Sequence, residues 1–325
     1  MKKEYPRLLK IISDGNFHSG EALAVKLGVS RAAIWKSIKS LQKNGLEVSA
    51  IPGKGYCLDN KFEPLLANEI ESMMSRRAQK CCKDINVVLE IKSTNSYFLD
   101  QLNQKKLIHG SVLLAEYQSD GRGRRNKKWL SPITSGICFS LGWRFEVMPI
   151  NLGLLSLYMG LAIARALKSL GLKGIGLKWP NDVLVMNHKI GGILLDIRGE
   201  SAGPLDVVIG VGVNYKLPKK EIVNIDQSII DISNASQKYL SRNMIAASLI
   251  SNIFEILNDL VIGSNSNLIK EWREYDCFFD QEAKLILANE EIMGTLKGIN
   301  DQGALLISVN GRLLSYNSGE VSLRI

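Results

Sequence analysis

The chain has 325 residues, of which 46% are hydrophobic, and a formal net charge of +9. This length and composition are typical of a globular protein with two or three domains. The apolar stretch at residues 8–12 is too short for a signal peptide, and residues 152–167 include Arg165 and are too short for a membrane span, so we expect a cytoplasmic protein without membrane association.

The cysteines support neither a disulfide framework nor a structural zinc site. They are five in number, contain no Cys-x-x-Cys pair and are accompanied by only three histidines. Adjacent Cys81 and Cys82 could form a redox pair, but a vicinal disulfide is strained. We therefore expect reduced thiols.

Positive charge is concentrated toward the N-terminus. Residues 1–60 contain ten basic and five acidic side chains, which gives +5 of the total +9. This excess favours a polyanionic partner for that end of the chain.

The same region has the pattern of a winged helix-turn-helix DNA-binding domain. Helices are predicted at residues 20–27 and 30–43, and we expect Gly28 between them to let them cross closely. Residues 46–51 and 56–58 flank a turn and predict a hairpin, the wing. The second helix has an apolar stripe at helical spacing and lysines on its far side. The expected DNA contacts are Ser30, Arg31, Ala32, Trp35, Lys36, Lys39, Lys43 and Lys54.

Two interpretations of Trp35 stay open. It could pack at the surface of the domain, or it could contact a base or a sugar.

The middle of the chain mixes strands and helices behind a linker at residues 63–68. Helices are predicted at residues 95–104, 152–170 and 242–261, the second ending at Gly171. Strands are predicted at residues 87–91, 111–117, 137–145, 183–185, 189–195 and 205–214. We expect a largely antiparallel sheet with helices on one side, and therefore an α+β fold. From Cys277 onward, short strands with turns at residues 288–290, 300–303 and 310–311 predict a small β-barrel.

Residues 119–129, Ser-Asp-Gly-Arg-Gly-Arg-Arg-Asn-Lys-Lys-Trp, form a loop with five cations and two glycines. Glycines let a backbone approach a ligand closely, and arginine forks suit carboxylates and phosphates. The segment lacks the glycine spacing of a dinucleotide fold, and no P-loop motif occurs in the chain. We interpret the loop as an anion clamp; a solvated basic loop or a nucleic-acid contact is the alternative.

Three other segments carry polar groups or glycines at strand ends. Ser93, Thr94 and Asn95 follow a strand and could cap a helix or bind a polar ligand. Residues 178–182, Lys-Trp-Pro-Asn-Asp, predict a tight turn between strands. In residues 208–214, Val-Ile-Gly-Val-Gly-Val-Asn, the two glycines could leave room for a flat ligand.

In this order, Ser-Thr-Asn, the Gly-Arg-Gly-Arg-Arg loop, Lys-Trp-Pro-Asn-Asp and Lys-x-x-Gly-Ile-Leu at residues 189–194 resemble the biotin-protein ligases. Residues 17–21, 30–34 and 48–56 resemble the bifunctional members that also repress the biotin operon. The resemblance implies a winged helix-turn-helix domain at residues 1–63. It further implies a biotin- and ATP-binding catalytic domain at residues 64–276, with a class II synthetase-like mixed sheet, and an SH3-like β-barrel at residues 277–325.

The implied reaction joins biotin to ATP and then to a lysine of the biotin carboxyl carrier protein of acetyl-CoA carboxylase. Forming biotinyl-5'-AMP brings two anions together, so fixed cations and Mg²⁺ should supply most of the stabilisation. Lys189, Arg122 and Arg124 are the expected catalytic residues. The alternative for Lys189 is an ordinary surface lysine.

The resemblance also assigns binding residues. For biotin they are Ser93, Thr94, Asn95, Gln118, Gly121, Arg122, Gly123, Arg124, Trp129, Lys189, Gly192, Gly210 and Gly212. For ATP they are Arg124, Arg125, Lys127, Asn181, Asp182, Lys189, Asn214 and Arg324, with Asp182 also positioning the metal ion. The chain departs from the repressor relatives at residues 223–231, where a tryptophan near the adenine is expected and Gln227-Ser228-Ile229-Ile230 stands instead.

The regulatory part of the resemblance implies that biotinyl-5'-AMP promotes a homodimer that represses transcription at a two-fold operator. Two alternatives remain from the sequence: a lipoyl or octanoyl ligase of the same fold, and a biotin-sensing transcription factor without ligase activity.

Overall fold

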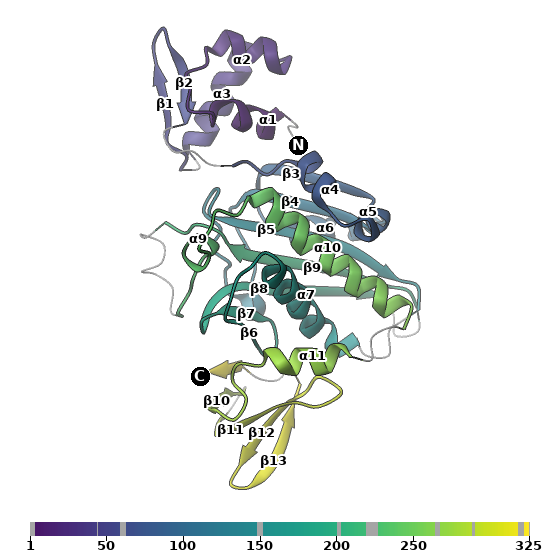
Figure 1. Cartoon of the computed structure of the whole chain (residues 1–325). Coiled ribbons are helices and arrows are strands. Elements are labelled where there is room, and N and C mark those ends of the chain that lie inside the picture. Colours follow the sequence, from purple (N-terminus) through teal and green to yellow (C-terminus); the bar gives the residue numbers. More distant parts are fainter. Residues whose placement is uncertain are drawn as a thin grey trace.

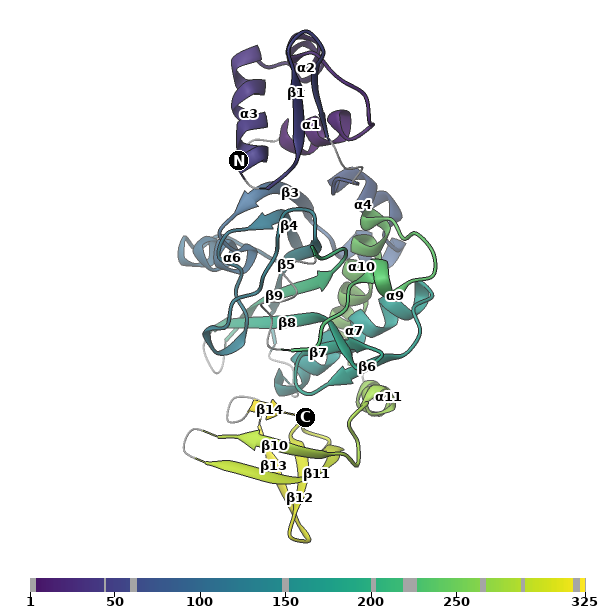
Figure 2. The same cartoon turned by 90° about the vertical axis from the view of Figure 1, so that its left-hand side faces the viewer.

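The computed structural model describes residues 4–43, 45–58, 63–147, 152–199, 203–218, 227–263, 267–287, 290–317 and 322–324. Three parts follow one another along the long axis of the molecule (Figures 1 and 2). A small helical part with a hairpin lies at one end, a large sheet flanked by helices lies in the middle, and a small sheet lies at the other end.

The N-terminal part is a helix-turn-helix followed by a hairpin, as the sequence predicts, and the helix α1 is an addition that was not predicted. Ser30 starts the second predicted helix, since its hydroxyl accepts the Ala33 N–H at 3.2 Å. The buried core of this part is aliphatic. The elements are α1 Glu4–Ile12, α2 Gly20–Leu27, α3 Arg31–Lys43, β1 Val48–Ile51 and β2 Gly55–Leu58, and the two strands pair antiparallel.

The predicted reason for Gly28 was wrong. A Cβ atom at this position would meet nothing within 4 Å, so the residue does not serve close helix crossing. Gly28 ends α2 in the left-handed conformation, with φ at +68°, where glycine is favoured because it has no side chain to clash.

The central sheet has seven strands in the order β3-β4-β5-β9-β8-β7-β6. Only β3 and β4 pair parallel among these neighbours, so the largely antiparallel prediction is confirmed. The strands are β3 Asp84–Ile91, β4 Ser111–Gln118, β5 Gly136–Phe145, β6 Ile175–Lys178, β7 Asp182–Val185, β8 His188–Gly199 and β9 Leu205–Asn214.

Helices cover both faces of this sheet, so the prediction of helices on one side was wrong. The main core joins one face to α7 Leu155–Ser169 and α10 Arg242–Val261, while α6 Thr94–Asn103 packs on the other face in a separate apolar cluster. The strand β4 is apolar on both sides: Val112 and Leu114 belong to the main core, and Leu113 and Ala115 belong to the α6 cluster. The remaining helices, none of them predicted, are α4 Ala67–Met73, α5 Arg76–Cys81, α9 Ile232–Ala235 and α11 Leu268–Tyr275.

Among the described residues, α10 is long and apolar enough to cross a membrane by length and composition. The structure places it in the main core beside α7 (Figure 1). Its first turn also holds the buried polar residues Arg242 and Asn243. These contacts make α10 the core helix of a folded domain.

The predicted linker is fastened to the central domain at several points. The Glu63 carboxylate accepts hydrogen bonds from the Ser241 hydroxyl at 2.6 Å, the Arg242 backbone N–H at 2.7 Å and the Asn243 side-chain amide at 2.7 Å. Leu65 is buried, and its N–H donates to Glu116 at 2.7 Å. The segment is therefore an anchored connection.

The same corner contains a buried ion pair. Arg242 and Glu116 approach to 2.8 Å with both side chains 1% exposed. Arg242 also donates to the carbonyls of Glu63 and Gly136. A buried charge of this kind is tolerated only with such partners.

The N-terminal part packs on the central domain through apolar side chains. Leu89 of β3 and Ile133 belong to the same buried cluster as Leu8, Leu9 and Ile12 of α1. An ion pair between Lys10 and Glu69 at 2.5 Å adds to this contact.

The C-terminal part is an antiparallel sheet in the order β13-β12-β11-β10-β14. In the described ranges β13 and β14 form its two edges, so closure of the predicted barrel is not confirmed. Positive φ angles at Asn310 and Gly311 confirm the predicted tight turn, whereas residues 288 and 289 of another predicted turn lie outside the described residues. The strands are β10 Glu282–Ile286, β11 Glu291–Ile299, β12 Leu305–Val309, β13 Arg312–Tyr316 and β14 Ser322–Arg324.

All five cysteines of the chain are free thiols.

Glu63→Gln should destabilise the protein at neutral pH. Burial alone would raise the pKa of Glu63, but the hydrogen bonds from Ser241, Asn243 and Arg242 outweigh it and hold the pKa below its ordinary value. A carboxylate with a lowered folded-state pKa stabilises the fold above its unfolded pKa and loses that contribution as the pH falls through the folded value. We expect a loss of about 1–3 kcal/mol in unfolding free energy near pH 7 that shrinks below about pH 4.

Urea denaturation near pH 7 and below about pH 4 measures the unfolding free energy of the variant and of the wild type. Glu282→Gln changes an exposed carboxylate on β10 and is the matched control. Equal losses for the two variants, or a Glu63→Gln loss that does not depend on pH, would contradict the anchoring role.

Candidate active site

A cavity of about 570 Å³ lies on the central domain between the glycine-arginine loop, the start of α6 and the middle strands of the sheet. It brings together almost all of the predicted site residues. Those lining it are Ser93, Thr94, Asn95, Gln118, Arg122, Gly123, Arg124, Arg125, Lys127, Trp129, Asn181, Asp182, Lys189, Gly192, Gly210, Gly212 and Asn214. The cavity is also lined by residues to which the sequence analysis gave no binding role, namely Lys128, Leu130, Phe139, Lys178, Trp179, Pro180, Ile193, Leu194, Val211, Leu217, Gln227, Ile229 and Leu323.

Two predicted residues are not brought to the cavity. Gly121 lies in the loop but does not line the cavity. Arg324 pairs through its backbone with Lys284 in the C-terminal sheet, and its side chain lies outside what the structure describes.

The glycine-arginine loop is folded back on itself by backbone hydrogen bonds. Gly123 N–H donates to the Lys127 carbonyl at 2.7 Å, and Trp129 N–H donates to the Gly121 carbonyl at 2.8 Å. The chain reverses at Arg125 and Asn126, whose φ angles are +53° and +58°. The loop therefore has a defined shape that points its cations in different directions.

The predicted role of the loop glycines was wrong in one respect. Neither glycine has a positive φ angle. A Cβ atom on Gly121 would lie 2.4 Å from the Trp129 carbonyl oxygen, which real structures do not show. Gly121 is required because the two arms of the loop approach closely, and not because the backbone approaches a ligand.

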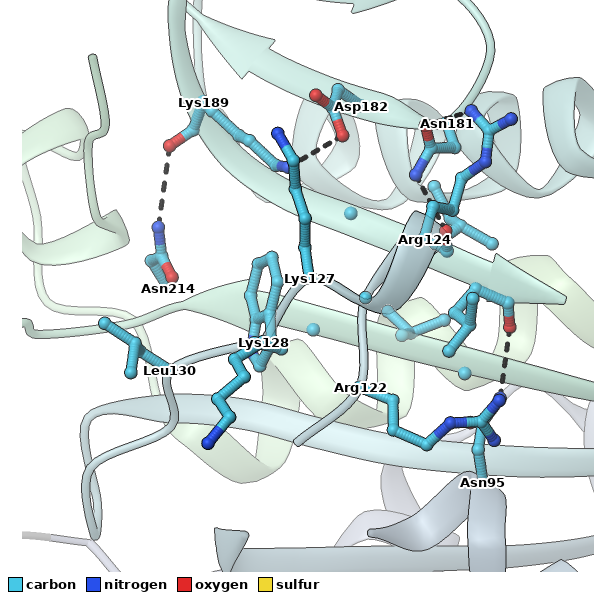
Figure 3. Close-up of a pocket in the computed structure, with 18 of the residues that line it drawn as sticks. Asn95, Arg122, Arg124, Lys127, Lys128, Leu130, Asn181, Asp182, Lys189 and Asn214 are labelled. Atoms are coloured by element: carbon cyan, nitrogen blue, oxygen red, sulfur yellow. Dashed lines mark hydrogen bonds and ion pairs between the residues drawn. The ribbon is translucent and has the colours of Figure 1, made fainter. Parts of the chain in front are cut away.

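One end of the cavity holds two cations, each with a partner (Figure 3). Lys189 Nζ lies 2.8 Å from a carboxylate oxygen of Asp182, and 5.6 Å from the centre of the Trp129 ring. Arg124 donates to the Asn181 side-chain oxygen at 3.1 Å. Burial, together with the neighbouring Arg125 charge, lowers the pKa of Arg124, although a guanidinium remains protonated in proteins.

The predicted Lys-Trp-Pro-Asn-Asp turn positions this end. It joins β6 to β7 and contains a cis peptide bond between Trp179 and Pro180. Asn181 fixes the turn to β8, because its backbone carbonyl accepts from Ile193 N–H at 3.0 Å and its side-chain amide donates to the Ile193 carbonyl at 2.9 Å. Asn181 and Asp182 are thus oriented by hydrogen bonds that do not use the Asp182 carboxylate.

The other end of the cavity is lined by neutral polar groups. The Gln118 side-chain oxygen accepts from Thr94 N–H at 2.8 Å. The Ser140 hydroxyl lies 2.7 Å from the Thr94 hydroxyl and 2.5 Å from the Asn95 side-chain oxygen. Ser93 caps α6, since its hydroxyl accepts from Ser96 N–H at 3.4 Å, so the capping alternative for this residue is what the structure shows.

Two residues of this end, Ser140 and Asp196, escaped the sequence analysis. Asp196 accepts from the Asn95 amide at 2.9 Å and from both terminal nitrogens of Arg122 at 3.1 Å. The available signal was a polar residue within an apolar run, Ser140 in residues 137–143 of β5 and Asp196 in residues 190–197 of β8. Arg122, predicted to bind biotin and to act in catalysis, lies beside Asn95 and away from Lys189 and Asp182 (Figure 3).

The glycines of β9 make room for protein side chains. A Cβ atom on Gly210 would lie 2.1 Å from the Asn95 side-chain oxygen, and one on Gly212 would lie 2.4 Å from the Trp129 indole. The space expected for a flat ligand is therefore filled by two residues that form the walls of the cavity.

Residues 227–230, where the sequence departs from the repressor relatives, lie against Lys189. The Lys189 backbone N–H donates to the Ser228 carbonyl at 2.9 Å, and Ile230 N–H donates to the Lys189 carbonyl at 3.0 Å. Asn214 donates to the Ile230 carbonyl at 3.1 Å. Residues 223–226 of this segment lie outside the described residues.

The residues predicted to contact DNA form an exposed surface of the N-terminal part. All of them are exposed, and Trp35 is 53% exposed, so it is not packed into the domain. Lys54 lies at the tip of the hairpin, and the others lie on or just before α3.

Comparison with known proteins agrees with this architecture. Residues 7–57 match the family model of the HTH domain, residues 88–214 match the biotin/lipoate A/B protein ligase family, and residues 278–324 match the biotin protein ligase C-terminal domain. The bifunctional ligase/repressor BirA of Salmonella typhimurium is 38% identical over 317 residues, which cover 98% of this chain and 96% of the relative. The chain belongs to the bifunctional ligase/repressor BirA family.

Other members and structures support the same assignment. BirA of Escherichia coli is 36% identical over 98% of this chain. The biotin protein ligase from Aquifex aeolicus, solved in complex with biotin and ATP, superimposes with a TM-score of 0.62 and 26% identity, covering 74% of this chain and 99% of that one. The family resemblance inferred from the sequence is therefore confirmed.

Gly212→Ala should displace Trp129 in this BirA-family protein. The added Cβ would lie 2.4 Å from the indole, and a side chain can turn away more easily than a strand can move. The intrinsic fluorescence should change, and the change should be absent in a Trp129→Phe background. Gly160→Ala, whose Cβ would make ordinary contacts with Leu177 and Ile193 at 3.5 and 4.0 Å and none with Trp129, is the control. A fluorescence change that persists without Trp129 would show that the glycine serves something else.

Proposed function

We propose that the protein is an ATP-dependent biotin-protein ligase and a transcriptional repressor of biotin synthesis genes. The observation that carries the proposal is the division of the cavity into two ends. One end offers neutral hydrogen-bonding groups beside the Arg122–Asp196 ion pair, and the other offers Lys189 and Arg124 held by polar partners. This division suits a ligand with a neutral urea head and an anionic tail that must meet a polyanionic nucleotide.

In the first step a biotin carboxylate oxygen attacks the α-phosphorus of ATP. A P–O bond forms, the bond to the leaving diphosphate breaks, and biotinyl-5'-AMP results. Negative charge gathers on the phosphoryl oxygens, so cations fixed before the reaction stabilise the transition state. Lys189 and Arg124 are placed for this, and Arg125 and Lys127 line the same cavity.

In the second step the amine of an acceptor lysine attacks the acyl carbon of the mixed anhydride. The amide bond forms, AMP leaves, and the amine loses a proton. The nucleophile belongs to the acceptor protein, which we propose to be biotin carboxyl carrier protein. The folded loop and Trp129 would limit the access of water to the adenylate.

We assign Arg122 to the biotin end of the cavity, the binding role expected from the sequence. Its guanidinium pairs with Asp196 beside Asn95. The loop would thus contribute one arginine to each end of the ligand.

Mg²⁺ is proposed to accompany ATP. Groups of three or more metal-binding side chains do not occur among the described residues, and Asp182 is a single carboxylate at the cationic end. That donor set fits an ion that keeps several waters and is held mainly by substrate phosphates. When bound, the ion would neutralise phosphate charge.

A lipoyl or octanoyl ligase is the second candidate, because the central family model includes lipoate ligases. The neutral polar end formed by Thr94, Asn95, Gln118 and Ser140 favours biotin. The aliphatic chain of an octanoyl or lipoyl group cannot form hydrogen bonds with these groups. A sensor without ligase activity is disfavoured by the paired cations.

Repression would use the exposed surface of α3 and the hairpin on operator DNA. Basic side chains on one face of a helix-turn-helix meet phosphates and position the helix in the major groove. We propose that biotinyl-5'-AMP promotes a cytoplasmic homodimer matching a two-fold operator. Sedimentation with and without the adenylate tests this, and equal coefficients at micromolar concentration would reject it.

We propose domain bounds of 1–63, 64–276 and 277–325. The anchoring of Glu63 on α10 supports a first boundary close to this residue.

Labelled biotin, Mg-ATP and a biotin carboxyl carrier domain test the ligase directly. We expect ATP-dependent label on the carrier. Binding of biotin without transfer would instead favour the sensor.

Lys189→Ala should slow adenylate formation by about 10²–10³-fold, because it removes a fixed cation from the reacting phosphate. Single-turnover formation of biotinyl-5'-AMP measures this step. Lys297→Ala removes another lysine paired with an aspartate, on β11 of the C-terminal sheet, and should leave the rate unchanged. A wild-type single-turnover rate in Lys189→Ala would remove this residue from the mechanism.

A further inference from the structure

Asp196 on β8 joins two residues of the neutral end of the cavity. One carboxylate oxygen accepts from the Asn95 amide at 2.9 Å, and the carboxylate accepts from both terminal nitrogens of Arg122 at 3.1 Å. The Asp196 side chain is 19% exposed, so it is largely withdrawn from water. The Arg122 charge balances the carboxylate and makes this burial tolerable.

Asn95 is held from both sides of its amide. Its two N–H groups point at Asp196 and at the Leu194 carbonyl, the latter at 3.3 Å. Its oxygen lies 2.5 Å from the Ser140 hydroxyl and directly above Gly210. Both donors are therefore used, and only the second lone pair of the oxygen is left for a ligand.

We propose that Asp196 is a positioning residue that holds Asn95 with its carbonyl oxygen toward the ligand, as an acceptor for an N–H of the biotin urea. The inference rests on the proposed function and adds a residue that determines the polarity of the head subsite. Without the Asp196 carboxylate, the Asn95 amide group can rotate. Its N–H groups would then face an N–H of the biotin urea, so two donors would meet and no hydrogen bond would form. The polar head is then bound less well, while the cationic end is unchanged.

Steady-state adenylate formation by the full-length protein tests the inference. Asp196→Ala should raise KM for biotin about tenfold or more, the size expected from losing a hydrogen bond to a charged group, with kcat and KM for ATP within about twofold. Asp196→Asn keeps an acceptor oxygen for Asn95 and should show a smaller rise. It also gives the measurement if the alanine variant fails to fold.

Asp206→Ala is a matched control on the neighbouring strand. Asp206 pairs with Arg144 at the same 3.1 Å, and its side chain is 17% exposed. Its loss should leave KM for biotin unchanged, because its partner Arg144 does not line the cavity, whereas Asn95 and Arg122, the partners of Asp196, do.

A double-mutant cycle separates positioning from general damage. If Asp196 acts through Asn95, Asn95→Ala and the double variant Asn95→Ala/Asp196→Ala should have the same KM for biotin. The inference would be overturned if the effects of the two substitutions on KM for biotin multiplied in the double variant. It would also be overturned if Asp196→Ala left KM unchanged or lowered kcat at constant KM. A wild-type protein that forms no adenylate would instead reject the proposed function.

Discussion

The site depends on holding two cations in a partly buried cavity. At 4 Å, two opposite charges near a protein surface interact by about 4 kcal/mol, so an unpartnered buried lysine would be unfavourable. In the β7–β8 hairpin Asp182 lies across from Gly192, and Lys189 reaches along the strand to pair with Asp182. Arg124 is held by a neutral amide, which orients it without cancelling its charge.

The cavity and the docking of the N-terminal part share one segment of chain. Trp129 forms a wall of the cavity, Ile133 packs in the cluster that holds α1, and the Gly136 carbonyl accepts from buried Arg242. Arg242 in turn binds Glu116 and the Glu63 carbonyl. The anchored connection at residues 63–66 and the wall of the cavity are thus supported by the same polar cluster, at the point where the two domains meet.

Strong local signals were sufficient to predict much of the fold. The bounds of α2, α10 and β9 follow from caps and periodicity, and the structure reproduces them. The helices α4 and α5 are short, whereas α1 and α11 are at least as long as α2 and strongly amphipathic and were overlooked. The site motifs were recognisable because each is a compact run of unusual residues. Asp196 was missed because its partner Asn95 is 101 residues away in sequence.

The roles of Gly28, Gly121, Gly210 and Gly212 were misassigned for a related reason. The role of a glycine depends on its backbone angle and on the atom that a side chain at that position would meet. The one-sided placement of helices failed because a strand that is apolar on both faces looks the same in sequence as one buried in a single core.

Biotin-dependent exchange of labelled diphosphate into ATP, measured without any acceptor protein, tests most directly the claim that this cavity activates a carboxylate. The account predicts exchange that requires biotin and proceeds without a carrier domain. Biotin binding without exchange, or exchange that does not depend on biotin, would contradict it.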